Sequence, residues 1–312
     1  MPPLVIAHRG ASGHRPEHTL ASYELAVEMG ADFIEPDLVI TRDGVLIARH
    51  ENEISETTDV SSRPEFADRR TTKLIEDVEV TGWFTEDFTL AEIKTLRARE
   101  RLSFRDRSYD GRFEIPAFDE VLDLALRKGV GVYPETKRPS YFRSIGLPLE
   151  EPLLAALERR GWTDRNAPVF LQSFETGSLR KLRKRTGVRL IQLLDEPGRP
   201  WDFTASGDFR TYLDLATPEG LAWIATYADG IGPNKRLIVP MDHDRRLRPP
   251  TSLVADAHRA GLLVHPWTFR SDPQFLAPDY EGRPEREYEQ FYELGVDGVF
   301  SDFPEVAVRR AV

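Results

Sequence analysis

Two carboxylates stand one residue apart near the start of the chain, at Glu35 and Asp37. Side chains two positions apart on an extended strand point to the same face of that strand. Two carboxylates held so close repel each other at neutral pH, and they need a cation or a shared proton between them. Glu135, at the end of a later apolar run, offers a third carboxylate. Ligand sets made only of oxygen, completed by water, are typical of Mg²⁺ or Ca²⁺, so the sequence predicts one divalent cation on these residues.

Two histidines follow short apolar runs and could serve as an acid and a base. His8 ends the run at 4–7, and Gly10 just after it allows a sharp turn. His50 ends a second run at 45–48. Phosphodiester cleavage needs a base to activate the attacking hydroxyl and an acid to protonate the leaving alkoxide. Either histidine alone would more often be structural, but His8 and His50 beside a metal site would supply such a pair. The remaining histidines have weaker claims: His14, His18, His243, His258 and His265.

Further polar side chains fall at the ends of apolar runs. Lys137 lies two residues beyond Glu135 and should face the same way, where its ammonium group could bind phosphate. Arg9 follows His8, Gln172 ends the run at 169–172 and Trp267 ends the run at 262–267. Convergence of all these residues on one rim is a stronger indication of a site than any one of them alone.

The composition narrows the class of partner. The chain has 312 residues, a formal net charge of −10 and no cysteine. The acidic balance argues against a nucleic-acid partner, and a phosphate-handling protein of this charge must concentrate positive charge locally. No apolar run approaches the roughly 20 residues that span a bilayer, so we expect no stable membrane insertion. The first ten residues do not resemble a signal peptide. We expect a periplasmic or secreted protein if a signal was removed, and otherwise a cytoplasmic one.

The elements that must position these residues alternate along the chain. Eight apolar runs read as buried strands, at 4–7, 33–38, 130–134, 169–172, 189–193, 230–232, 262–267 and 298–301. Helical patterns separate most of them, at 18–29, 117–128, 149–160, 176–184, 218–227, 251–260 and 285–294. Alternation of this kind predicts a parallel sheet, and eight units suffice to close a (β/α)8 barrel with its site at the carboxyl ends of the strands. The alternative is an open doubly wound sheet.

One segment, about 51–116, interrupts the alternation. It is rich in charged residues and holds no convincing barrel strand. Within it, Thr89 and Glu92 are spaced as a capping box that opens a helix through about Arg99. We expect a single domain over 1–312 in which this segment forms an insertion lobe after the second strand.

The ordered motifs resemble those of the glycerophosphodiester phosphodiesterase family, and most closely those of its bacterial periplasmic subgroup. The resemblance rests on His8-Arg9-Gly10-Ala11, Pro16-Glu17-His18-Thr19, Glu35-Pro36-Asp37, Asp43-Gly44 before His50, Glu135-Thr136-Lys137, Gln172-Ser173-Phe174, Trp267-Thr268 and Gly298-Val299-Phe300-Ser301-Asp302. It spans nearly the whole chain. It implies a barrel, a divalent metal and hydrolysis of glycerophosphodiesters to sn-glycerol 3-phosphate and an alcohol.

By residue, the resemblance implies the acid–base pair and the three metal ligands already named. It also implies that Arg9 and Lys137 bind phosphate and that Trp267 forms a wall of the substrate site. Glu17 and Gln172, which lie in matching motifs, complete the expected substrate-binding set. The chain departs from the family pattern at Glu51, where Asp is usual after the histidine, and at Pro36 between two ligands.

Two other functions remain open at this point. One is a related barrel, similar to a phospholipase D, that acts on lysolipids or sphingolipids and would need an apolar rim. The other is a binding protein of the same fold without catalysis, although the presence of both histidines argues against it. The expected partner is a small glycerophosphodiester. The sequence does not choose between Ca²⁺ and Mg²⁺, between water and the glycerol hydroxyl as nucleophile, or among oligomeric states.

Overall fold

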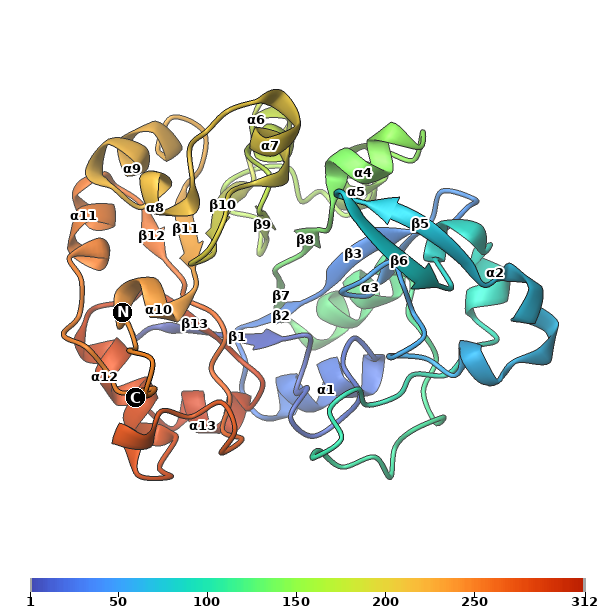
Figure 1. Ribbon diagram of the computed structural model, residues 1–312, viewed down its shortest axis with the longest axis horizontal. Coiled ribbons are helices and arrows are strands. Elements are labelled where there is room, and N and C mark those ends of the chain that lie inside the picture. The colour runs from blue at the N-terminus through green and yellow to red at the C-terminus, as the bar shows by residue number, and fades with distance from the viewer. Residues whose placement is uncertain (1, 311–312) are drawn as a thin grey trace.

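Parallel strands close on themselves in the computed structural model, which describes residues 2–310 (Figure 1). The first strand, β1 (Leu4–His8), pairs in parallel with the last, β13 (Gly298–Ser301), on one side and with β2 (Phe33–Glu35) on the other. The strands that complete the barrel between β2 and β13 are, in chain order, β3 (Asp37–Ile40), β7 (Gly131–Val132), β8 (Glu135–Thr136), β9 (Phe170–Ser173), β10 (Arg189–Leu194), β11 (Gly230–Pro233) and β12 (Leu263–Val264).

The hydrogen-bonded strands fall into two sheets that join at both seams. At one seam, the Val132 amide donates to the Pro168 carbonyl at 2.9 Å, and Gln172 donates to Pro134 at 3.0 Å. At the other, Asp297 donates to Val264 at 2.9 Å and Phe300 to Pro266 at 3.0 Å. The predicted eight-stranded barrel is confirmed, and the doubly wound alternative is excluded.

The second barrel strand keeps one direction, but its hydrogen-bonded pairing with the neighbouring strands is interrupted. Instead of one strand over 33–38, the chain forms β2 and β3 with Pro36 between them, because proline has no amide hydrogen for the ladder. The third strand follows the same break as β7 and β8. The amides of Tyr133, Glu135 and Lys137 donate to the carbonyls of Ile34, Pro36 and Leu38, so the two strands stay in register across the break.

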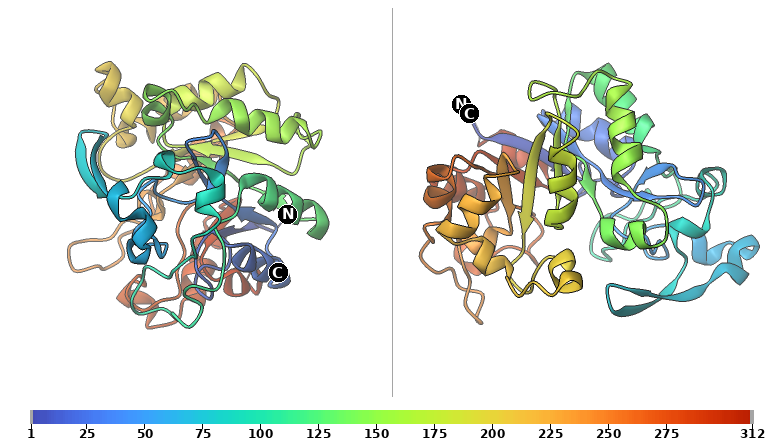
Figure 2. Two further views of the ribbon diagram at one scale, coloured as in Figure 1. Left: turned by 90° about the vertical axis from the view of Figure 1, so that its right-hand side faces the viewer. Right: turned by 90° about the horizontal axis from the view of Figure 1, so that it is seen from above.

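Helices surround the barrel at the positions that the sequence predicts. They are α1 (Leu20–Glu28), α3 (Phe118–Lys128), α5 (Glu150–Glu158), α6 (Thr176–Arg183), α9 (Pro218–Ile224), α11 (Leu253–Arg259) and α12 (Glu285–Glu293), followed by α13 (Pro304–Val308). Four shorter helices lie in the loops: α4 (Pro139–Ser144), α7 (Trp201–Ser206), α8 (Tyr212–Leu215) and α10 (Lys235–Ile238). The last helix packs beside β1, so both ends of the described chain lie on one side (Figure 2).

The barrel interior is filled by a small aromatic and aliphatic cluster. It consists of Ile6, Phe33, Tyr133, Phe170, Ile191 and Phe300. The Tyr133 hydroxyl lies 2.8 Å from Nδ1 of His265, which is fully buried among these rings. His265 is therefore a residue of the core and takes no part in the site above it.

The insertion lobe begins after β4 (Leu46–Ala48), which pairs antiparallel with β3. It contains an antiparallel hairpin, β5 (Thr71–Ile75) and β6 (Val78–Gly82), with the short helices η1 (Val60–Ser62), η2 (Pro64–Arg69), η3 (Thr85–Asp87) and α2 (Leu90–Ile93). No helix in the described part of the chain is long and apolar enough to cross a bilayer.

The capping box at Thr89 and Glu92 is present, but the helix it opens is shorter than predicted. It ends at Ile93, and the chain then becomes extended. The amide of Asp59 donates to the Arg97 carbonyl at 3.0 Å, and the amide of Arg99 donates to Thr57 at 2.9 Å. This pairing with a distant segment satisfies the backbone that a longer helix would have used.

Candidate active site

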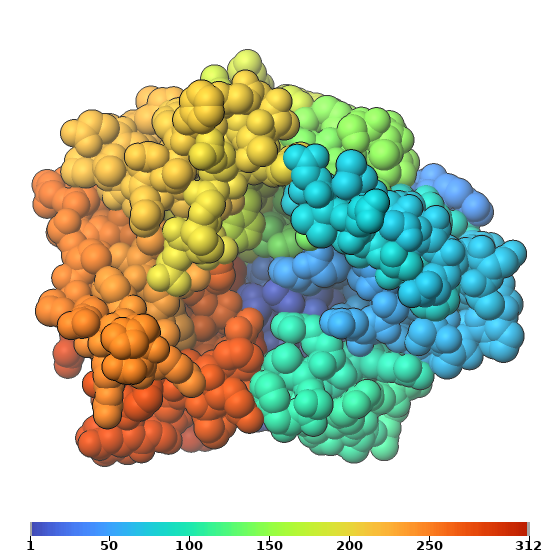
Figure 3. All heavy atoms as spheres, viewed as in Figure 1, coloured from blue at the N-terminus to red at the C-terminus, as the bar shows by residue number. Residues whose placement is uncertain are grey.

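A cavity of about 520 Å³ opens at the carboxyl ends of the barrel strands. Figure 3 shows it as a hollow between the hairpin β5–β6 in cyan, the segment around residue 200 in yellow and the segment around residue 105 in teal. The cavity wall includes most of the predicted site residues: His8, Arg9, Glu35, Asp37, His50, Glu135, Lys137, Gln172 and Trp267. Of the ten site residues predicted from the sequence, only Glu17 does not line the cavity.

The three predicted metal ligands meet at the floor of the cavity. One carboxylate oxygen from each of Glu35, Asp37 and Glu135 lies within 4.8 Å of the others, and all three side chains are buried. Asp37 and Glu135 are neighbours in the register of β3 and β8, and Glu35 ends β2. The break at Pro36 therefore leaves all three carboxylates close together.

Neighbouring groups hold the carboxylates in place. Glu35 accepts from the Arg9 amide at 2.8 Å and from Nε2 of Gln172 at 3.1 Å. Lys137 Nζ lies 2.9 Å from Glu135 Oε1. His18, which had only a weak claim from the sequence, lies 3.0 Å from Asp37 Oδ2 through its Nε2 and is fully buried.

Two buried oxygens in this cluster fit a cation. Asp37 Oδ1 and Gln172 Oε1 have no hydrogen-bond partner among the described residues. A buried polar atom without a partner is costly, and a bound cation would satisfy both. The donor set is all oxygen, which suits Ca²⁺ or Mg²⁺.

Burial, the neighbouring carboxylates and the neighbouring cations together shift the pKa values of the three carboxylates. Burial and the charge of Asp37 raise the pKa of Glu35 well above its ordinary value. Burial raises the pKa of Glu135 to about 8, against the opposing effect of Lys137. Burial alone would raise the pKa of Asp37, but the charge of Lys137 and the hydrogen bond from His18 help to lower it well below the usual range. A divalent cation beside these carboxylates would favour their ionised forms.

His8 is fixed by a carboxylate from the last strand end. Its Nδ1 lies 2.7 Å from Asp302 Oδ1, and both residues are buried. Because a carboxylate only accepts, Nδ1 carries the hydrogen and Nε2 is left with a lone pair. Burial and the nearby Arg9 lower the pKa of His8 to about 4, so the ring is neutral at neutral pH.

His50 makes a second pair of the same kind. Its Nδ1 lies 2.9 Å from Glu51 Oε1, and Glu51 Oε2 accepts from Arg138 Nη2 at 2.8 Å. Glu51, where the family usually has Asp, thus orients His50. Partial burial together with the charges of Arg9 and Lys137 lowers the pKa of His50 below its ordinary value.

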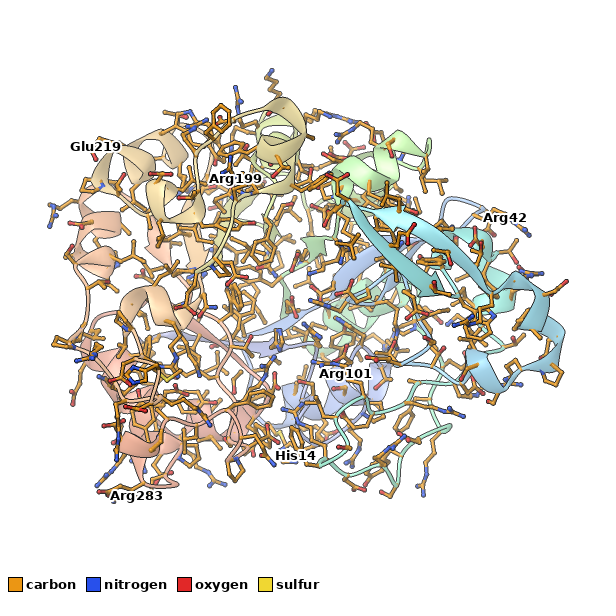
Figure 4. All side chains as sticks on the ribbon, viewed as in Figure 1. His14, Arg42, Arg101, Arg199, Glu219 and Arg283 are labelled. Carbon is orange, nitrogen blue, oxygen red and sulfur yellow. The ribbon has the colours of Figure 1, made fainter. Side chains whose placement is uncertain are left out.

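Arg9 and Glu17 form a separate layer beside the carboxylates. Arg9 Nη1 lies 3.1 Å from both oxygens of Glu17, and Arg9 Nε lies 3.2 Å from Asp37 Oδ2. A third group, Arg101 of the insertion lobe, donates to Glu17 at 2.9 Å. Figure 4 labels Arg101 below the opening and Arg199 above it. Glu17 therefore holds Arg9 and is not itself exposed to the cavity.

Aromatic side chains form another part of the cavity wall. The Trp267 ring lies 5.7 Å from the ring of Phe174, and its Nε1 donates to the Gly232 carbonyl at 2.7 Å. Phe174 in turn lies 6.1 Å from Tyr212. The cavity lining therefore combines apolar rings with the charged side chains of the cavity floor.

Several groups of the site could not be found from sequence pattern. Asp302 is the last residue of one of the family-like motifs but had no predicted role, and its partners Arg105 and Arg270 lie in loops without a motif. His18 lies in one of the quoted motifs, and this membership was the only signal for it. The other three histidines on the surface do not line the cavity: His14 pairs with Glu305, His243 with Asp244 and His258 with Asp297.

Comparison with known proteins identifies the family. The model of the "Glycerophosphoryl diester phosphodiesterase family" matches residues 8–306. A glycerophosphodiester phosphodiesterase of Arabidopsis thaliana is 39% identical, over 96% of this chain and 84% of the relative. One from Bacillus subtilis is 31% identical, over 97% of this chain and 84% of the relative.

Solved structures share the fold. A protein from Silicibacter pomeroyi, described as a glycerophosphoryl diester phosphodiesterase, superposes with a TM-score of 0.71 at 21% identity, covering 100% of this chain and 94% of the other. An Oleispira antarctica phosphodiesterase, solved with sn-glycerol-3-phosphate, gives 0.63 at 23% identity, with coverages of 99% and 96%. With a family model that spans almost the entire barrel, the chain belongs to the glycerophosphoryl diester phosphodiesterase family.

Proposed function

We propose that this protein hydrolyses glycerophosphodiesters to sn-glycerol 3-phosphate and an alcohol, using a divalent cation and two histidines. Family membership and the names of its relatives support the reaction class. The observation that carries the finer proposal is the meeting, in one cavity, of a buried carboxylate triad with two histidines, each paired to a carboxylate.

The triad is proposed to hold Ca²⁺ or Mg²⁺ through Glu35, Asp37 and Glu135. When bound, such a cation polarises phosphoryl oxygens and offsets their negative charge. Arg9 and Lys137 lie on the same wall, and their positive charges favour a phosphodiester there. Each also has a carboxylate partner, so the phosphate would meet cations that are already oriented.

His8 and His50 are proposed to share the proton transfers. A neutral imidazole with a free Nε2 accepts a proton from the attacking hydroxyl, and the carboxylate behind it stabilises the imidazolium that forms. A bound phosphodiester raises the pKa of a histidine beside it, because a nearby negative charge favours the protonated ring. The histidine on the leaving-group side can then donate to the departing alkoxide.

A second candidate substrate is a lysolipid, and one observation favours it. Leu74 and Val78 are 62% and 60% exposed on the hairpin β5–β6, whose tip residue Glu76 lines the cavity and pairs with Arg138. Exposed apolar side chains on a hairpin whose tip reaches the cavity would contact an acyl chain that extends out beside it. The charged character of the rest of the lobe favours the soluble diester as the main substrate.

One screen tests the proposal. Purified protein is treated with EDTA, divided, and supplied with Ca²⁺, Mg²⁺ or nothing, and hydrolysis of glycerophosphocholine, glycerophosphoglycerol and a lysolipid is measured. We expect activity on the soluble diesters only with metal. Full activity in the metal-free sample would exclude the proposed cation. Activity on the lysolipid alone would make the lysolipid the substrate and exclude the soluble diesters. Binding of a soluble diester without turnover under every condition would instead indicate a binding protein.

A further inference from the structure

Asp302 is clamped between the barrel and the insertion lobe. Its Oδ1 lies 2.7 Å from His8 Nδ1. Its Oδ2 lies 2.6 Å from Arg105 Nη2 and 3.1 Å from Arg270 Nε. One oxygen therefore serves the histidine and the other is occupied by two guanidinium groups.

Arg105 is the unexpected member of this set, because it comes from the lobe. Its side chain is 5% exposed and makes contacts with three separate barrel loops. Beyond Asp302 it reaches Asp272, through Nε at 3.1 Å and Nη2 at 2.6 Å, and it donates from Nη1 to the Ser12 carbonyl at 3.0 Å. A guanidinium held by so many partners fixes the rotation of the carboxylates it touches.

We propose that Arg105 is a positioning residue for His8, acting through Asp302. The inference rests on the proposed role of His8 in proton transfer. With Arg105 and Arg270 on Oδ2, Asp302 presents Oδ1 to His8, and this hydrogen bond sets both the tautomer and the angle of the ring. Without Arg105 the carboxylate can rotate about its side-chain bonds, and Nε2 of His8 leaves the orientation needed for proton transfer.

A second lobe arginine supports this view of the segment and provides a matched comparison. Arg101 donates to Glu17, which holds Arg9. Arg101 therefore contacts the carboxylate that holds Arg9, whereas Arg105 contacts the carboxylate that holds His8. Arg107, in the same segment, is 54% exposed and pairs only with Asp110 among the described residues.

The competing explanation is that Arg105 only fastens the lobe to the barrel. The two explanations differ in how the loss caused by Arg105→Met combines with the loss of His8. If Arg105 acts through His8, its effect disappears once the histidine is gone. If it acts on the lobe as a whole, its effect persists.

The experiment is a double-mutant cycle on the full-length, metal-loaded enzyme. We expect Arg105→Met to lower kcat at least about 10-fold, part of the 10²–10⁴-fold that a general acid or base supplies, with KM changed less than about threefold. In the His8→Ala background the same substitution should lower kcat less than about twofold. Arg101→Met should lower activity similarly in both backgrounds, and Arg107→Met should leave it unchanged. Arg105→Lys should restore part of kcat, because it keeps the charge but not the fork.

The proposal would be overturned if Arg105→Met lowered kcat by the same factor in both backgrounds. It would also be overturned if Arg105→Met left kcat unchanged in the enzyme that retains His8. If Arg105→Met does not fold, as judged by its thermal unfolding, Arg105→Lys and Arg105→Gln enter the same cycle. A failure of the proposed function is distinguishable, since His8→Ala alone would then keep full activity.

Discussion

His18 Nε2 donates to Asp37 Oδ2 across 3.0 Å, so a histidine stands directly behind one of the three carboxylates at the cavity floor. The other ring nitrogen, Nδ1, lies 2.8 Å from the Tyr23 hydroxyl. Burial lowers the pKa of His18, which is consistent with a neutral ring that donates to Asp37 and accepts from Tyr23. His18 therefore orients Asp37, one of the three proposed metal ligands.

We expect His18→Ala to weaken metal binding about 10- to 100-fold, the usual effect of removing a group that orients a metal ligand. The measurement is Ca²⁺ binding by titration calorimetry, beside kcat at saturating Ca²⁺, which should change much less than in His8→Ala. His14→Ala serves as the control, because His14 pairs with Glu305 away from the cavity. A large loss of kcat at saturating metal, with normal affinity, would place His18 in the proton transfers.

Removal of either cavity histidine should lower kcat by about 10²–10⁴-fold and leave metal binding intact. The double variant should lose less than the product of the two single losses, because the two groups act as a unit. A diester of p-nitrophenol scarcely needs an acid to release its alcohol. It should therefore rescue only the variant that lacks the acid, and this assigns the roles of His8 and His50. Rescue of neither variant would contradict the assignment.

The exposed leucine and valine of the hairpin can be tested for lipid contact. If Leu74 and Val78 touch an acyl chain, Leu74→Ser with Val78→Ser should raise KM for a lysolipid several-fold and leave the kinetics on glycerophosphocholine unchanged. Leu126→Ser on α3 is the control, because Leu126 is 50% exposed but does not belong to the hairpin. An unchanged KM for the lysolipid would remove the argument for that substrate.

Glu175 should make stability depend on pH. Burial raises its pKa from 4.5 to about 7, partly offset by hydrogen bonds from Ser140. Between these two values the unfolded chain has already lost the proton that the folded protein keeps, so the free energy of unfolding falls as pH rises. The loss is on the order of 3 kcal/mol and is complete above about pH 7.

Glu175→Gln removes that ionisation. Measured by urea unfolding, the variant should be more stable than the parent at pH 8 and have no such advantage at pH 4.5. The parallel variant Glu79→Gln, at an exposed hairpin position, should follow the parent at both pH values. A constant difference between parent and Glu175→Gln across this range would show that Glu175 titrates normally.

The barrel, and the meeting of Glu35, Asp37 and Glu135 in one cluster, could be predicted from the sequence because both depend on local pattern. Strands buried on both faces are apolar throughout, and Glu35, Asp37 and Glu135 follow such runs directly. The sequence shows Pro36 between the two carboxylates, but it does not show that the strand pairing breaks there. That break depends on the neighbouring strand and not on local pattern.

Long-range contacts explain what the sequence did not show. Arg101 meets a partner 84 residues away and Arg105 one 197 residues away, and neither arginine differs in type from the solvated ones around it. The helix expected through Arg99 stops early for the same reason, because residues 97–99 pair with 57–59. In a charged insertion, burial of a side chain is decided by the fold of the rest of the chain.

His8 and Asp302 lie 294 residues apart, on the first strand and just after the last, and these two strands pair side by side. Synthesis delivers the first partner at the outset and the second only as the chain nears completion. The histidine is therefore without its carboxylate for almost the whole of translation, and a fragment that lacks β13 carries an unsupported His8. The pairing of β13 with β1 closes the barrel, and the same pairing brings Asp302 to His8. Recovery of turnover after dilution from denaturant should therefore report the docking of the last strand, a contact of high sequence separation.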